Sequence, residues 1–227
     1  MLMPTDVTRP GDAIMASSEN SPGAELAPNA IDNDSGTKYL NFDADDRTGE
    51  GVPTGFVVTP SIGGTLVTGM TLTSANDAVE RDPMIVELYG SYALAAPAWD
   101  DPMAWVPITW VEVPAFTARF ETQTFAFDNE LAYNHYRWMV VEVADPAAAN
   151  SMQIAEVELL GMLGTVVEPI MLGMPVIADG QVTITWSGGG ELQTSPDLMN
   201  WTGTGDSSGA YTEPTESGNR FYRVVAP

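Results

Sequence analysis

Apolar and polar residues alternate over short stretches of this chain, and a two-residue period is typical of β-strands buried on one face. In residues 182–186, valine, isoleucine and tryptophan alternate with threonines, and residues 122–127 repeat the pattern with phenylalanines. Further apolar segments of strand length are Thr65–Thr73, Met84–Tyr89 and Trp105–Val113. Glycine and proline turns separate these segments, and hardly any stretch favours helix. The pattern predicts an all-β protein, either a sandwich or a barrel.

Two strands are predicted to differ in how they are buried. In Ile154–Leu160, small and apolar side chains alternate with glutamates, so Glu156 would face outward near a strand end, where it could reach a metal ion. Residues 138–141, by contrast, are a continuous apolar run. Such a run predicts a strand that is covered on both faces.

Punctuation by glycine and proline also predicts the domain organisation. We expect an N-terminal extension at residues 1–10, an antiparallel β-sandwich over 11–164, a linker over 165–175 and a small β-domain over 176–227. The last part contains about four short strands, and so small a core is marginal without disulfides or a metal. We therefore expect the small domain to lean on the first domain or on another subunit, because its outer strands would be unpaired edges.

Composition narrows the classes of partner and cofactor. Cysteine is absent, which excludes disulfides and thiolate metal sites, and 31 acidic against 8 basic residues give a formal charge of −23. This charge disfavours nucleic acids and anionic membranes and favours neutral or cationic partners and divalent cations. No apolar run reaches the roughly 18 residues of a membrane span. Residues 1–4 lack the features of a signal peptide, so we expect an extracellular or cell-surface protein in a processed form.

A turn-rich segment around Gly36 concentrates oxygen ligands. It contains Asp32, Asn33, Asp34, Ser35, Thr37 and Asp43. Calcium takes six to eight oxygen ligands and favours turns that bring several oxygens inward. The spacing is not that of an EF-hand, whose sixth and twelfth positions from Asp32 would hold glycine and glutamate. The alternative is a solvated turn, because these residue types are also the usual turn formers.

A second polar loop, residues 76–82, combines amide, carboxylate and guanidinium groups, which are suited to holding sugar hydroxyls. Its candidate ligand-binding residues are Asn76, Asp77, Glu80 and Arg81. The alternative is that Arg81 pairs with Asp77, Glu80 or a distant acid and only fixes the loop. Aromatic side chains would supply a stacking surface for a sugar ring, and the candidates are Tyr39, Phe42, Tyr92, Trp99 and Trp105.

The sequence offers little support for catalysis. Residues 205–209 match the Gly-x-Ser-x-Gly pattern, but that motif requires a buried strand before it and a helix after it. His135 is the one histidine, and it lies far away in sequence at the start of a predicted strand. A single histidine also excludes two-histidine zinc motifs. We therefore expect a protein that is not an enzyme.

Three groups of residues resemble a known family. Residues 29–32 with 37–39 resemble its early Asp-Thr-Trp turn, residues 155–161 resemble its closing strand, and residues 74–83 and 88–91 resemble a version found in secreted proteins of environmental bacteria. From Gly11 to Gly161 the chain thus resembles a discoidin-type, galactose-binding-like β-sandwich of the coagulation-factor 5/8 C-domain and family-32 carbohydrate-binding-module kind. Residues 192–201 and 221–224 resemble a small terminal β-module that follows catalytic or binding domains in secreted bacterial proteins.

The resemblance implies a structural Ca²⁺ shared by the early Asp and Thr and the late Glu of the family. In this chain those positions are Asp32, Thr37 and Glu156, with Asn29 and Asp34 as additional candidates. The chain departs from the family pattern at Asn33, where the family has glycine, and at Tyr39, where it has tryptophan.

Two functions remain open at this point. The first is a calcium-stabilised, non-catalytic module that binds an extracellular glycan or cell-surface polymer and serves adhesion. The second is a structural subunit of a self-assembling extracellular filament, sheath or surface layer, forming a homo-oligomer through the C-terminal domain. The 12 methionines, which are adaptable interface residues, and the apolar residues of 161–176 favour the second.

Overall fold

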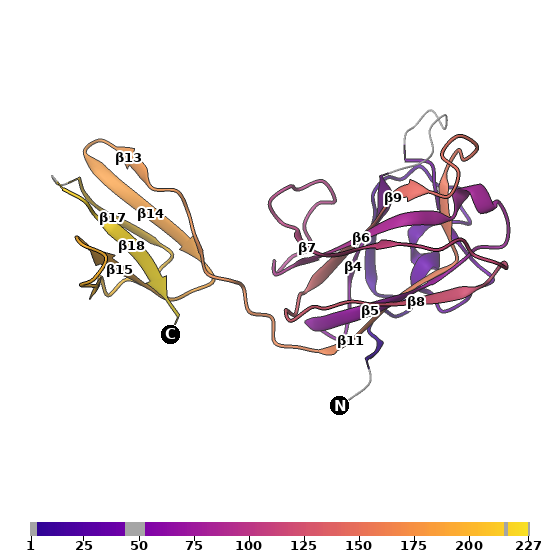
Figure 1. The fold of residues 1–227 in the computed structure, drawn as a ribbon, viewed down its shortest axis with the longest axis horizontal. Helices are drawn as coiled ribbons and strands as arrows, with labels where there is room; N and C mark the ends of the chain where they lie inside the picture. Colours follow the sequence, from indigo (N-terminus) through magenta and orange to yellow (C-terminus); the bar gives the residue numbers. More distant parts are fainter. Residues whose placement is uncertain (1–3, 44–52, 216–217, 227) are drawn as a thin grey trace. The chain divides into compact units, whose positions relative to one another are not determined.

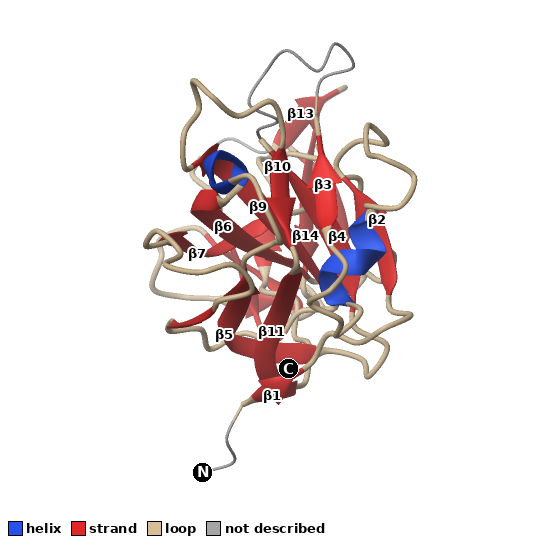
Figure 2. Cartoon of the chain, turned by 90° about the vertical axis from the view of Figure 1, so that its right-hand side faces the viewer, coloured by secondary structure: helices blue, strands red, loops and turns tan. Residues whose placement is uncertain are grey.

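The computed structural model describes residues 4–43, 53–215 and 218–226. The chain folds into two units, Met1–Val166 and Val167–Pro227, and each is built from antiparallel strands (Figure 1). In the residues that the structure describes, helix is confined to two short 3-10 segments, η1 (Ala27–Ile31) and η2 (Val79–Arg81), which are blue in Figure 2. No helix in the described part of the chain is long and apolar enough to cross a membrane. The predicted all-β class is confirmed.

Two sheets form the layers of the first unit. One has the order β1–β11–β5–β8, with bounds Thr5–Asp6, Glu156–Leu163, Thr65–Thr73 and Thr122–Ala126. The other has the order β2–β4–β9–β6–β7, with bounds Ala13–Ala16, Thr54–Thr59, His135–Val143, Pro83–Ser91 and Val106–Glu112. A separate pair joins β3 (Tyr39–Asn41) to β10 (Met152–Ile154), and it carries the segments on which the candidate site depends.

The core lies between the two sheets and contains the side chains that the alternation points inward. Phe56 and Trp138 stack with their ring centroids 5.3 Å apart, and both are fully buried. From the facing sheet, Met70, Leu72 and Leu159 are equally buried. The continuous apolar run at 138–141 is less covered than expected, because only every second side chain of β9 points into this core and the others are half-buried. The prediction that this strand is covered on both faces is therefore wrong.

The first described residues of the chain belong to the sandwich. Strand β1 pairs with β11, so that Thr5 lies opposite Gly161 and Asp6 opposite Leu160. Val7 is 1% exposed, and its backbone N–H donates to the Leu159 carbonyl. The expected N-terminal extension at residues 1–10 is wrong for its described part, residues 4–10, because Thr5 and Asp6 complete an edge of the sheet.

The second unit is a small pair of sheets. One contains β12 (Met171–Leu172), β13 (Val176–Ala178), β14 (Gln181–Ser187) and β17 (Ala210–Pro214), and the other contains β16 (Thr202–Gly203), β15 (Glu191–Ser195) and β18 (Phe221–Val225). Among its described residues, the buried hydrophobic core consists of Val182, Ile184, Trp186 and Leu192. The segment expected to be a linker, residues 165–175, contains β12, because Met171 and Leu172 pair with β14.

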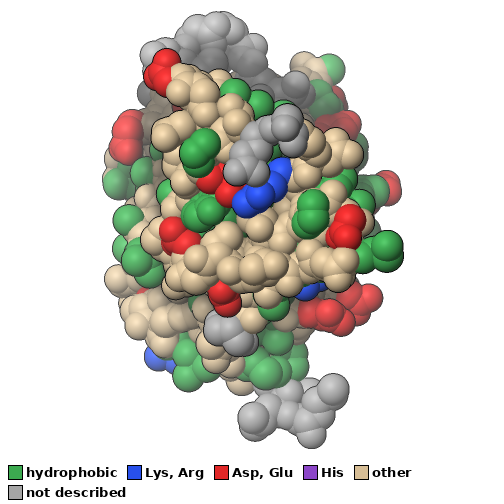
Figure 3. Space-filling model, turned by 90° about the vertical axis from the view of Figure 1, so that its left-hand side faces the viewer, with side chains coloured by type: hydrophobic (Ala, Val, Ile, Leu, Met, Phe, Trp, Pro, Cys, Tyr) green, Lys and Arg blue, Asp and Glu red, His purple; other side chains and the backbone are tan. Residues whose placement is uncertain are grey.

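Acidic side chains are spread over the surface, as the net charge requires. They are distributed across the face drawn in Figure 3, where basic side chains are few. Because so few cations are present, the acids that do receive one are informative about the structure.

A close backbone approach in β4 provides a test of the fold. Gly55 has φ +155°, and a Cβ at this position would lie 2.0 Å from the Trp138 carbonyl oxygen of β9. We expect Gly55→Ala to lower the free energy of unfolding by about 2–4 kcal/mol through overpacking and backbone strain. Gly23→Ala, where no atom lies within 4 Å, is the matched control. Unfolding in urea is followed by tryptophan fluorescence. Equal urea midpoints for the two variants would contradict this packing.

Candidate functional site

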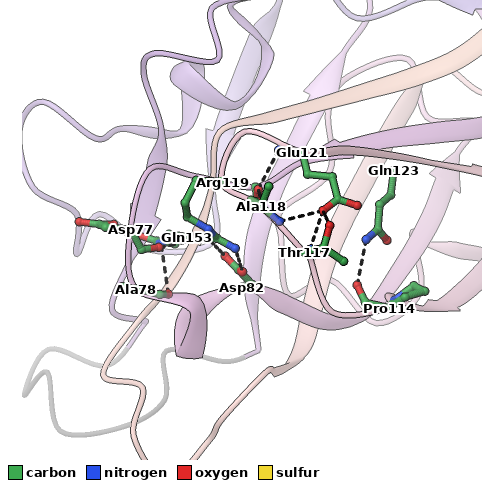
Figure 4. A network of polar contacts seen from close by, with 11 residues as sticks. Asp77, Ala78, Asp82, Pro114, Thr117, Ala118, Arg119, Glu121, Gln123 and Gln153 are labelled. Carbon is green, nitrogen blue, oxygen red and sulfur yellow. Dashed lines mark hydrogen bonds and ion pairs between the residues drawn. The ribbon is translucent and has the colours of Figure 1, made fainter.

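The polar loop, residues 76–82, connects β5 to β6 at one end of the sandwich. Its centre is the 3-10 turn η2, which is preceded by Ala78 in a left-handed conformation with φ 45°. A non-glycine residue rarely adopts this conformation unless its surroundings impose it. The contacts that fix the loop come from distant parts of the chain, and Figure 4 shows several of them.

Arg119 forms the first of these contacts. Its guanidinium donates two hydrogen bonds to the carboxylate of Asp82, at 2.9 and 2.5 Å, and a third to the Asp77 carbonyl at 3.1 Å (Figure 4). Asp82 is only 4% exposed, and this burial raises its pKa even though Arg119 acts in the opposite direction. The pair therefore fastens both ends of the loop to the segment before β8.

Lys38 and Gln153 fasten the loop from the other side. The Lys38 ammonium donates to the Asp77 carboxylate at 2.8 Å and to Gln153 Oε1 at 3.0 Å. The Gln153 amide in turn donates to the carbonyls of Asp77 and Ala78, and Gln153 is fully buried in β10. The hydrogen bond from Lys38 is the main reason why the pKa of Asp77 is lowered. Asp77 is thus a structural anchor of the loop.

The remaining predicted residues of the loop are presented outward to different degrees. Asn76 is exposed, and Glu80 and Arg81 are partly exposed. No ion pair of Arg81 is found among the described residues, and its Nε is buried without a hydrogen-bond partner. Asp77, one of the acids expected to pair with Arg81, instead binds Lys38, and the arginine that fixes the loop is Arg119.

Tyr39 was expected to be a stacking surface, and this prediction is wrong. Its ring is fully buried in the core, 6.4 Å from Phe56 between centroids, and its hydroxyl donates to the Gly55 carbonyl at 3.0 Å. Burial raises its pKa to about 12. The aromatic position of the family's turn is therefore occupied by a core residue.

Two of the other aromatic candidates, Trp99 and Trp105, lie away from the loop as well. Trp99 and Trp105 lie in the segment after β6, at the end of that strand opposite the loop. Together with Tyr89 they surround the Arg137 guanidinium, which is 4.2–5.5 Å from the three ring centroids. These rings hold an arginine by cation–π contacts and fix their own segment to the sheet.

Two hollows lie beside the polar loop. A shallow one of about 380 Å³ is lined by residues 76–79 and 116–119. A larger groove of about 670 Å³ is lined by Val79, Glu80 and residues that include Met84 and Phe116. Among the described residues, Phe116 is the aromatic residue that lines both hollows. Arg81 lines neither of these two hollows.

The oxygen-rich turn folds against the closing strand. Thr37 Oγ1 donates to Asp32 Oδ2 at 2.8 Å, and the Asp34 N–H donates both to Asp32 Oδ1 at 2.9 Å and to Glu156 Oε1 at 2.8 Å. Asp32, Thr37 and Glu156, which are far apart in sequence, are therefore brought together. The Asp34 carboxylate points instead at the N–H of Gly36, 2.9 Å away.

The electrostatics of Glu156 differ from those predicted. Glu156 is 5% exposed, so the expectation that it faces solvent is wrong: the turn covers that face of β11. Burial, together with the neighbouring Asp32 carboxyl, raises the pKa of Glu156 to about 8, and its Oε2 has no hydrogen-bond partner. Two carboxyls and a hydroxyl with one unpartnered buried oxygen form a donor set that suits a hard cation such as Ca²⁺.

Two observations limit the ligand set. The Asn29 amide donates to the carbonyls of Ala24 and Lys38, both at 2.9 Å, so its amide nitrogen stabilises the turn. Within the described ranges, no group of three or more His, Cys, Asp or Glu side chains is placed to hold a metal. Any cation here would rely on Thr37 and on backbone carbonyls as well as on carboxylates.

His135 and the serine loop have structural surroundings. The His135 ring is 3% exposed, with Nδ1 2.8 Å from Thr59 Oγ1 and Nε2 3.0 Å from the Ala93 carbonyl, and burial lowers its pKa. Residues 205–209 connect β16 to β17 in the second unit, with no helix after them. The structural context that the Gly-x-Ser-x-Gly motif requires is therefore missing.

Sequence reasoning missed Lys38, Gln153, Arg119 and Phe116. One signal was present, because Lys38 is the only lysine of a strongly acidic chain and a lone cation is worth a search for its partner. Nothing local marks Gln153, whose role arises from a contact that spans 115 residues.

Comparisons with known proteins support the fold through structure alone. No protein-family model matches the sequence, and no curated protein matches it. Among solved structures, a family-32 carbohydrate-binding module from a family 31 glycoside hydrolase of Clostridium perfringens is similar with a TM-score of 0.51 and 12% identity, over 65% of this chain and 90% of that one. Two such modules of C. perfringens ZmpB, in complex with GalNAc, give 0.51 and 14% over 70% and 36%.

A third structure agrees with these two. A fragment of a putative chitobiase from Bacteroides thetaiotaomicron gives a TM-score of 0.50 and 13% identity, over 69% of this chain and 95% of that one. At such low identity the likeness concerns the fold. The suspected resemblance is confirmed at that level: the first unit has a β-sandwich fold similar to that of these family-32 carbohydrate-binding modules.

Proposed function

We propose that the first unit is a non-catalytic, calcium-stabilised module that binds an extracellular glycan or cell-surface polymer and serves adhesion. The observation that carries the proposal is the braced polar loop beside an open groove of about 670 Å³. A binding loop that is already ordered loses little entropy when a ligand arrives. The groove combines planar polar groups with an apolar floor. A pyranose ring matches both, because its hydroxyl groups can bind the polar groups and its C–H face can pack on the floor.

The charge of the chain restricts the glycans that the module would bind. With a formal charge of −23, sulfated or uronic polymers would be repelled, and neutral or cationic sugars would not. Asn76 lines the shallow hollow and Glu80 lines the larger groove, and both would contact the sugar. Arg81 lies in the same 3-10 turn but lines neither hollow. Among the described residues it forms no ion pair, so we propose that its guanidinium contacts sugar hydroxyls from beside the groove.

Calcium would be held by Asp32, Thr37 and Glu156 and would supply the positive charge that two neighbouring carboxyls lack. The same turn leads directly into Lys38, whose ammonium fixes Asp77 of the polar loop. A cation at the turn would therefore stabilise the position of Lys38, which supports the polar loop. Structural calcium sites are common in extracellular modules, which is consistent with a protein that works outside the cell or on its surface.

A non-catalytic role fits the engaged histidine. Both ring nitrogens of His135 are within hydrogen-bond distance of structural partners, and the lowered pKa keeps the ring neutral. A general base needs a free nitrogen within reach of substrate. We therefore propose that the chain binds its target without transforming it.

A second candidate function is a structural subunit that self-associates through the second unit. The observation that favours it is a concentration of exposed large apolar residues on one segment: Leu163, Val167, Met171, Leu172, Met174, Val176 and Ile177. Exposed apolar patches on an edge strand mark interaction surfaces. If this second function holds, substitutions in the polar loop would leave function unchanged.

The glycan proposal predicts a specific effect of Arg81. Calorimetry with neutral sugars, such as galactose, GalNAc and N-acetylglucosamine oligosaccharides, is the measurement. We expect a dissociation constant of about 0.1–1 mM for the preferred sugar. Arg81→Ala should weaken that binding about ten-fold at an unchanged melting temperature, because no buried acid is left unpaired. Arg9→Ala, an exposed arginine of the same unit, is the control. Binding that is equal in both variants would contradict a role of Arg81.

The calcium proposal predicts a metal-dependent stability. Removal of calcium by a chelator should lower the melting temperature by about 5–10 °C if the site is normally near saturation. Glu156→Gln should abolish this difference. A melting temperature of the wild-type protein that the chelator leaves unchanged would contradict the proposal.

The pKa of Glu156 predicts how this effect depends on pH. Its folded-state pKa of about 8 lies above the ordinary value of 4.5, so the calcium-free protein is most stable below pH 4.5 with respect to this group. That stability is lost as pH rises from about 4.5 through 8, when the buried carboxyl must ionise. Calcium should therefore stabilise more at pH 8 than at pH 5. The pH dependence should be smaller in Glu156→Gln, measured by differential scanning calorimetry.

Self-association predicts a dependence on the exposed segment. If the second candidate holds, light scattering of the full chain should give a mass above that of the monomer. Val176→Lys, which places a charge on the 61% exposed β13 position, should restore the monomer. Ser208→Lys in a loop of the same unit is the control. A monomeric full chain at high concentration would exclude the structural role.

A further inference from the structure

The larger groove beside the polar loop has four walls from different parts of the first unit. They are η2, the start of β6, the segment that follows β7, and the turn at residues 144–148. Backbone hydrogen bonds link these walls in pairs. The turn is joined to the polar loop by Ala144 N–H to the Asp82 carbonyl and Asp145 N–H to the Glu80 carbonyl, and the segment after β7 is joined to β6 by Val113 N–H to the Met84 carbonyl, at 2.8–3.1 Å. The groove is therefore a formed feature rather than a gap between loose loops.

The floor of this groove is apolar. Val113 is 4% exposed, Met84 and Phe116 are partly buried, and Val79 is 59% exposed at the edge. An exposed valine next to an aromatic ring offers a flat apolar surface that water does not stabilise. The C–H face of a pyranose ring is a ligand group of matching shape and polarity.

The rim of the groove is acidic, and its charge is largely uncompensated. Its carboxylates are Glu80, Asp82, Glu112 and Asp145. Asp82 is paired with Arg119, whereas no ion pair of the other three is found in the described part of the chain. One oxygen of Asp145 accepts the N–H groups of Ala147 and Ala148, which fixes its position without cancelling its charge. An apolar floor under three free carboxylates complements a cation with an apolar body.

We infer that this groove selects a sugar residue with a free, protonated amine, that is, an unacetylated amino sugar. The inference rests on the proposed glycan-binding function and adds the substrate class. The ring would lie on Val79 and Phe116, and the ammonium group would face Glu80 and Glu112. An N-acetyl group removes the charge, and a uronic or sulfated sugar reverses it, so both are bound less well.

Calorimetry with two matched ligands tests the inference. The β-1,4-linked glucosamine trimer and its fully N-acetylated counterpart are titrated at pH 6 and low salt into the full chain. The glucosamine trimer is expected to bind at least ten-fold more tightly, and its affinity is expected to fall as salt screens the carboxylates.

Charge-removing variants locate the binding. Glu80→Gln and Glu112→Gln keep the side-chain shape, and each is expected to weaken glucosamine binding about five-fold, the upper end for a partly exposed ion pair. Glu130→Gln removes the same charge from an exposed position outside the groove and is expected to change nothing. All three variants should melt at the wild-type temperature, since the first two carboxylates have no ion pair to lose.

The outcomes separate this inference from the function beneath it. If a neutral or acetylated sugar binds at least as well as glucosamine, and both groove variants leave that binding unchanged, the amine selectivity is wrong while glycan binding stands. If no sugar binds but a lysine-rich peptide does, in a way that Glu112→Gln weakens, the groove is a peptide site and the glycan proposal also fails. Loss of glucosamine binding in Glu130→Gln to the same degree would reduce the effect to net charge and overturn the site.

Discussion

The ion pair between Arg119 and Asp82 is the contact on which the candidate site depends. Asp82 is almost fully buried at the junction of the polar loop and β6, and Arg119 reaches it with two hydrogen bonds while a third fixes the Asp77 carbonyl. Leaving a buried carboxylate unpaired destabilises a protein by roughly 3 kcal/mol or more. The pair is thus a strong restraint on the loop, and it also removes Asp82 from the groove's free charge.

A second chain of contacts connects the loop to the oxygen-rich turn. Glu156 accepts a hydrogen bond from the turn, the turn continues into Lys38, and Lys38 binds both Asp77 and Gln153. Because Gln153 lies in β10, immediately before the strand that carries Glu156, the two predicted sites share one support. A change in the ionisation of Glu156 would therefore act on the same β3–β10 pair that positions the polar loop.

The sequence predicted the features that depend on local pattern. Thr65–Thr73 was predicted as a strand with the bounds that β5 has, and alternation in 182–186 located β14, because each depends on which face of a single strand is apolar. Strand β4 was missed, since Gly55 interrupts its pattern and the strand is buried between two neighbours. The predictions for single side chains were wrong for a different reason. Alternation correctly placed Glu156 on the outer face of its strand, but the turn that covers this face lies 122 residues away in sequence and was not predicted to do so.

The same limit applies to the loop residues. Residue type correctly marked 76–82 as a polar loop, but type alone does not say which acid receives which cation. Asp77 was a candidate ligand because it is exposed and acidic, and it became an anchor because β3 brings the only lysine beside it. Tyr39 had the chemistry of a stacking ring, yet its position in β3 points it at Phe56 in the core. Contacts of this kind are set by topology, which the one-dimensional pattern does not contain.

The buried acids of the first unit differ in how their charge is balanced. In the described part of the chain three carboxylates are less than a tenth exposed: Asp12, Asp82 and Glu156. Asp12 is stabilised by the backbone N–H groups of Arg9 and Ser61, and Asp82 by Arg119. Glu156 alone has an oxygen without a partner and another carboxyl as its neighbour. A buried acid must be neutralised, by a proton or by a cation, and the hard oxygen ligands around Glu156 are the reason for proposing Ca²⁺ there.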